Sequence, residues 1–175
     1  AVVSQYRAAL SYAHHAHRDT RLTLLDCPGE RLADLPMAGR THATWSDWML
    51  TQLRAPECAP HAAEFLALVD ANERDEPTLL SAFRRALARL ALAYTPIVSP
   101  STFVLDESGH EIAPSERTVE AMERTRHAGL DASSQFCPLA PAQRDADPAL
   151  ARRMAERFDA YRARLVEPLA RWLRR

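Results

Sequence analysis

Cys58 and His61 are the residues of this sequence whose types and spacing best suit nucleophilic chemistry. A thiol becomes a nucleophile when a neighbouring base or a helix N-terminus lowers its pKa. His61 follows Cys58 at a spacing of three, and Pro60 beside them marks the expected start of a helix. We take Cys58 and His61 as the candidate catalytic pair, and a half-buried structural cysteine is the alternative.

Two groups of residues have the spacing of metal ligands, but neither completes a site. His14 and His17 are three residues apart in an expected helix, where both imidazoles would share a face. Cys58 and His61 have Cys-x-x-His spacing, but a structural zinc takes four protein ligands and no second tight pair is present. We therefore expect no metal and no cofactor. A small metal- or thiol-dependent enzyme that uses these residues remains an alternative.

The motifs of several enzyme classes are missing from the sequence. It contains no Gly-x-Ser-x-Gly, no Walker phosphate loop and no His-Glu-x-x-His. Glycine occurs only 4 times, which argues against a glycine-rich loop around a phosphate. Cys27, Cys58 and Cys137 are an odd number, so we expect no complete disulfide framework and favour a reducing compartment.

Trp45 and Trp48, with Met49 beside them, form the densest aromatic group in the sequence. Most tryptophans pack in a core, but one that stays exposed is a typical hot spot for protein recognition. Leu139 is an apolar residue in an expected long loop. Trp45, Trp48 and Leu139 are therefore the candidate partner-binding residues, with core packing as the alternative.

The elements that would position these residues are mainly helices. Apolar residues recur at three- and four-residue spacing, and the composition is rich in alanine and poor in glycine. The turn sequence Asp-Glu-Ser-Gly between residues 102–105 and 110–112 predicts one short β-hairpin. We expect a loop over 130–147 and helices over 2–18, 44–55 with Thr44 as N-cap, 60–71, 77–94, 114–128 and 148–172, the last with a kink at Pro168.

These elements predict a mostly α single domain of about six helices over residues 1–175, which divides, if at all, into lobes 1–95 and 113–175. The start at Ala1 suggests a piece of a larger protein. Hydrophobic residues make up 47% and charged residues 26%, as in ordinary globular proteins. No run approaches 18 apolar residues, and the net charge of −1 gives no general attraction to nucleic acid. We therefore expect neither a membrane span nor a nucleic-acid partner.

As a whole, the sequence resembles the XL-box, the C-terminal ubiquitin-ligase domain of the Xanthomonas outer protein L type III effectors. The resemblance rests on length, on a helical composition rich in alanine, arginine, leucine and proline, and on the start at Ala1. It also rests on the absence of lysine, since all 22 basic residues are arginine. GC-rich codon usage is the alternative explanation for the missing lysine. No signature motif supports the resemblance, so no catalytic position is transferred.

This resemblance implies a ubiquitin-protein ligase, a transferase secreted into the host cytoplasm as a virulence factor. Such a domain would dock a host ubiquitin-conjugating enzyme and its ubiquitin, without zinc and without a Cys-x-Asp nucleophile. None of the three cysteines is followed two residues later by aspartate. The residues themselves leave a non-catalytic helical protein-interaction domain as the alternative. They leave the substrate and the oligomeric state open.

Overall fold

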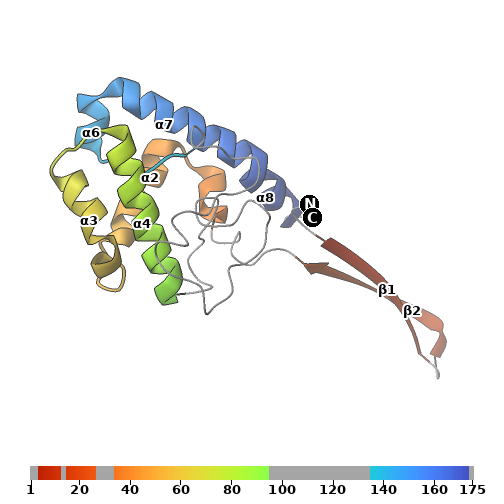
Figure 1. The fold of residues 1–175 in the computed structure, drawn as a ribbon. Helices are drawn as coiled ribbons and strands as arrows, with labels where there is room; N and C mark the ends of the chain where they lie inside the picture. Colours follow the sequence, from red (N-terminus) through yellow and green to blue (C-terminus); the bar gives the residue numbers. More distant parts are fainter. Residues whose placement is uncertain (1–3, 13–14, 27–33, 95–134, 174–175) are drawn as a thin grey trace.

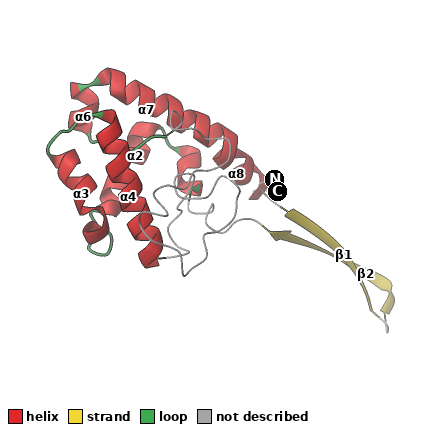
Figure 2. Ribbon diagram, viewed as in Figure 1, coloured by secondary structure: helices red, strands yellow, loops and turns green. Residues whose placement is uncertain are grey.

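The computed structural model describes residues 4–12, 15–26, 34–94 and 135–173. This part of the chain is mostly helical, as the sequence predicted, and the helices form one body (Figure 1). A two-stranded hairpin projects from the end of that body near the last helix (Figure 2). Within the described residues, no helix combines the length and apolarity needed to cross a lipid bilayer.

The hairpin consists of β1 (Ser4–Tyr12) and β2 (His15–Asp26), paired antiparallel with Ala8 opposite Leu22. A helix over 2–18 was expected here, and that prediction is wrong. Every second residue from 6 to 12 is alanine, leucine or tyrosine, so the segment fits the two-residue period of a strand as well as the helical period. Pairing with a second strand decides between the two periods.

The helical body is built from short and medium-length elements. In chain order they are the 3-10 turn η1 (Leu35–Gly39), α2 (His42–Leu53), α3 (Ala59–Asp70), α4 (Glu76–Tyr94), α6 (Pro141–Ala146), α7 (Pro148–Tyr161), the π-helical turn η5 (Arg162–Val166) and α8 (Glu167–Leu173). The helices expected over 60–71 and 77–94 are present with nearly those bounds. The hairpin expected at 102–112 and the helix expected over 114–128 lie outside the described residues.

Helix α2 starts earlier than expected because Thr41, and not Thr44, is its N-cap. The Thr44 backbone N–H donates to Thr41 Oγ1 at 3.3 Å, and the Thr41 N–H donates to Thr44 Oγ1 at 3.0 Å. Thr44 is therefore the third helical residue of a capping box, in which two side chains satisfy two backbone donors. The capping chemistry was recognised in the sequence, but it was placed three residues too late.

A tight reversal joins α3 to α4 and lets the two helices pack side by side. Asn72 has a φ of 56°, the left-handed conformation that commonly ends a helix. The next N–H, of Glu73, donates to the Leu68 carbonyl at 2.9 Å, and Asp75 then caps α4 by accepting from the Thr78 N–H at 3.1 Å. Asparagine is one of the few residues besides glycine that adopts this conformation readily.

The expected loop over 130–147 contains the short helix α6, so that prediction is wrong in part. Pro141 opens α6, and Gln143 holds it through two bonds. Its Oε1 accepts from the Ala140 N–H at 2.9 Å, while its Nε2 donates to the Glu73 carbonyl at 2.6 Å. Gln143 is fully buried, and a buried amide needs such partners. The bond to Glu73 joins α6 to the α3–α4 reversal.

The last expected helix, over 148–172, is divided into α7, the π-helical turn η5 and α8. The kink predicted at Pro168 therefore lies two residues after the π-helical turn η5, where the regular α-helix is interrupted. Proline has no N–H, so it offers no helical bond to the carbonyl of Arg164, four residues before it. The extra residue that a π turn inserts rotates the following segment, and Leu169 and Ala170 on α8 are buried in this arrangement.

One hydrophobic core joins all the larger helices. Trp45 of α2 lies 5.2 Å, between ring centroids, from Phe158 of α7, and Phe65 of α3 lies 5.1 Å from Phe83 of α4. Phe136 packs edge-on against Trp45 at 5.3 Å. The described parts of the two suggested lobes therefore share a single core.

Candidate functional site

The candidate catalytic pair lies at the start of α3. Cys58 is half-buried and precedes the first residue of the helix, and the His61 N–H donates to the Cys58 carbonyl at 3.0 Å. Partial burial raises the pKa of the Cys58 thiol, and the charge of Glu57 raises it further. Both effects disfavour the thiolate, which is the reactive form. The structure therefore shows no activation of Cys58, although sequence spacing had suggested it.

The other cysteines offer no better nucleophile in the described part of the chain. Cys137 has no exposed surface, and burial raises the pKa of its thiol strongly. It is a free cysteine, as is Cys58. Cys27 lies outside the described residues. Cys137 therefore packs as a small apolar residue, which is the common role of a buried free cysteine.

Two of the three candidate partner-binding residues lie in the core, which corrects the expectation of exposed anchors. Trp45 is 3% exposed and Leu139 is 0% exposed, and both belong to the hydrophobic core. Trp48 is half-buried, and the Arg40 guanidinium lies over its ring at 5.0 Å from the centroid. This cation–π contact stabilises the turn into α2. A side chain without exposed surface cannot make first contact with a partner.

The histidines proposed as metal ligands do not share a helix face. His17 lies in β2, and His14 lies outside the described residues. Among the described residues, no group of three or more histidine, cysteine, aspartate or glutamate side chains is placed to hold a metal ion. Of the two proposed histidine ligands only His17 is described, and it is not part of any such group.

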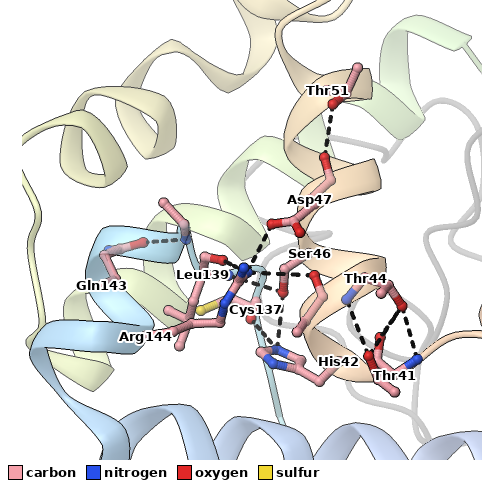
Figure 3. Close-up of polar contacts among 12 residues, drawn as sticks. Thr41, His42, Thr44, Ser46, Asp47, Thr51, Cys137, Leu139, Gln143 and Arg144 are labelled. Carbon is pink, nitrogen blue, oxygen red and sulfur yellow. Dashed lines mark hydrogen bonds and ion pairs between the residues drawn. The ribbon is translucent and has the colours of Figure 1, made fainter.

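The sequence analysis missed a buried polar group in the described helices. His42, on the first turn of α2, is 3% exposed, and its Nε2–H donates to the Cys137 carbonyl at 2.9 Å (Figure 3). The Ser46 hydroxyl lies 3.4 Å from the same nitrogen and accepts from the Leu139 N–H at 3.2 Å. Together His42 and Ser46 bind the segment around Cys137 to α2.

Burial sets the direction in which the pKa of His42 is shifted. Burial lowers its pKa, and the Arg144 guanidinium lowers it further, while the bond to the Cys137 carbonyl and the charge of Asp159 oppose the shift. Arg144 itself donates to the Leu139 carbonyl at 2.6 Å and to Asp47 at 2.9 Å (Figure 3). These bonds are internal to the protein, so we assign the group a structural role.

A shallow hollow of about 650 Å³ lies beside this group, between α2 and the start of α6. Its charged members are already paired: Asp47 with Arg144 at 2.9 Å, and Arg54 with Asp70 at 2.5 Å. The rest of the lining is threonine and small or apolar residues, Leu50, Thr51, Ala55, Ala140 and Pro141. The hollow therefore presents no unpaired charge for recognition of a ligand.

The end of α7 holds the turn η1, which is the first described element after the hairpin. The Tyr161 hydroxyl donates to Asp34 Oδ2 at 2.6 Å, and both side chains are buried. Arg162 Nη1 donates to the Arg40 carbonyl at 2.6 Å. Asp34 and Arg40 lie on either side of η1, the first described element after the hairpin. These two bonds fix η1 on the helical body.

The two strands of the hairpin pair in one antiparallel register. Tyr6 is the register partner of Leu24, Ala8 of Leu22 and Leu10 of Thr20, and the register shifts between Ser11 and Tyr12. We call β1 and β2 together the arm.

Comparison with known proteins gives one match. The model of the YcjX-like family, DUF463, matches residues 2–173. No curated protein and no solved structure matches the chain.

The family match overturns the resemblance to the XL-box ubiquitin-ligase domain. The ligase activity, the type III effector assignment and the virulence role are therefore wrong. The expected conjugating-enzyme partner and the host location depended on that resemblance and lose their basis. Composition misled because richness in alanine and arginine reflects helix propensity, which unrelated helical folds share.

Proposed function

This chain belongs to the YcjX-like family, and we propose that its described part acts as an association module, in which the helical body holds the arm for contact with another polypeptide. The observation that carries the proposal is a two-stranded antiparallel hairpin that projects from a well-packed helical body (Figure 1). Association here means non-covalent binding of the arm to a second chain.

The physical state of an isolated hairpin supports this role. Two strands alone are marginally stable in water, and stability requires further strands or a packed apolar face. Each strand of a two-stranded sheet also has an open edge of backbone donors and acceptors, which is a template for pairing. Among the described residues, the sheet of the arm consists of β1 and β2, so the arm is a two-stranded sheet of this kind.

The helical body supports the role by holding the turn η1, which follows the arm in the chain. The bonds from Tyr161 to Asp34 and from Arg162 to Arg40 fix η1 against the π-helical turn. Behind them, Phe136 and Phe158 pack with ring centroids 5.5 Å apart in the core. A contact element on a rigid support loses less conformational entropy on binding than one on a mobile chain.

The environments of the candidate catalytic residues favour association over a thiol-dependent enzyme. Burial raises the pKa of both described cysteines, and the imidazole of His42 already binds the Cys137 carbonyl. A general base must reach the proton of its substrate. In the described part of the chain these groups serve packing and internal hydrogen bonds.

A photo-crosslinking experiment tests the proposal. A photoreactive residue is placed at position 24, in β2 of the arm, and at position 156, an exposed position on α7, as the control. We expect an intermolecular adduct at 24 and little at 156. The adduct is identified by mass spectrometry and its partner chain is purified.

Leu24→Asp should then weaken binding of the purified partner by about tenfold or more, with an unchanged melting temperature. Adducts only within the same chain, or equal yields at both positions, would refute the proposal.

A further inference from the structure

We draw no further inference here: the strongest candidate, the shallow hollow between α2 and the start of α6, has charged lining residues that already pair within the protein, and nothing in the described structure shows what covers it.

Discussion

Mild acid should destabilise this protein through His42, a single buried imidazole. His42 is 3% exposed, and its Nε2–H donates to the Cys137 carbonyl at 2.9 Å. Protonation would place a positive charge on a ring that packs between Trp45 and Phe158, both 5.7 Å away between centroids. Arg144 repels that charge as well. For these reasons the pKa of His42 in the folded protein lies below its ordinary value of 6.5.

The direction and size of the effect follow from proton linkage. As the pH falls below 6.5, the unfolded chain binds a proton at His42 before the folded protein does. The unfolded state is then favoured, so the free energy of unfolding decreases by up to about 1.4 kcal/mol for each pH unit until the folded protein also protonates. The contribution of the neutral ring is complete above pH 6.5. The carboxylates of Glu64 and Glu76 are paired with arginines, and their pKa values are lowered from 4.5. These two groups therefore lose their stabilising effect only below about pH 4.5.

Urea unfolding between about pH 7.5 and about pH 5.5 measures this slope without interference from those carboxylates. His42→Gln is the informative variant, because its amide N–H can still donate toward the Cys137 carbonyl but does not titrate. His61→Gln, half-buried at the start of α3, is the matched control. We expect a steep slope for the wild type and for His61→Gln and a shallower one for His42→Gln. Parallel curves for the wild type and His42→Gln would show that the reasoning is wrong.

Three further predictions test the core, a helix cap and the cysteines. Phe158→Ala should lower the free energy of unfolding by about 3–5 kcal/mol, because the ring is fully buried and lies 5.2 Å from that of Trp45; an unchanged urea midpoint would contradict this packing. Thr41→Ala should cost about 1 kcal/mol by removing the N-cap of α2, and a cost near zero would mean that the capping box does not form in solution. In native protein, a thiol reagent followed by mass spectrometry should modify Cys58 and spare Cys137, and labelling of both at similar rates would refute the burial of Cys137.

Sequence reasoning succeeded where local chemistry decides the structure. Proline occupies the first turn of α3, α4 and α7, at Pro60, Pro77 and Pro148, and each marks the helix start to within a residue or so. Proline suits this position because its missing N–H has no intrahelical partner there. The helical periodicity of apolar residues in α4 and α7 identified the faces that are buried.

The candidate site could be predicted much less well, because burial depends on contacts between distant residues. His42 lies 95 positions from its partner Cys137, and no local pattern joins them. The same holds for Trp45 and Leu139, which looked like exposed anchors but fill a core closed by α7. Cys58 has the spacing of an activated thiol, but partial burial and the neighbouring Glu57 raise its pKa.

The sequence by itself determined the mostly helical class, the starts of the proline-marked helices and their apolar faces, since each depends on residues within a turn or two. Only the tertiary structure decided that residues 4–26 form a hairpin. Their apolar residues suit both a strand and a helix, and the energy of a strand lies in hydrogen bonds to another segment. Periodicity within one segment cannot supply that partner. The sequence analysis therefore expected a helix where the structure has a hairpin, because a strand is stabilised by hydrogen bonds to another segment.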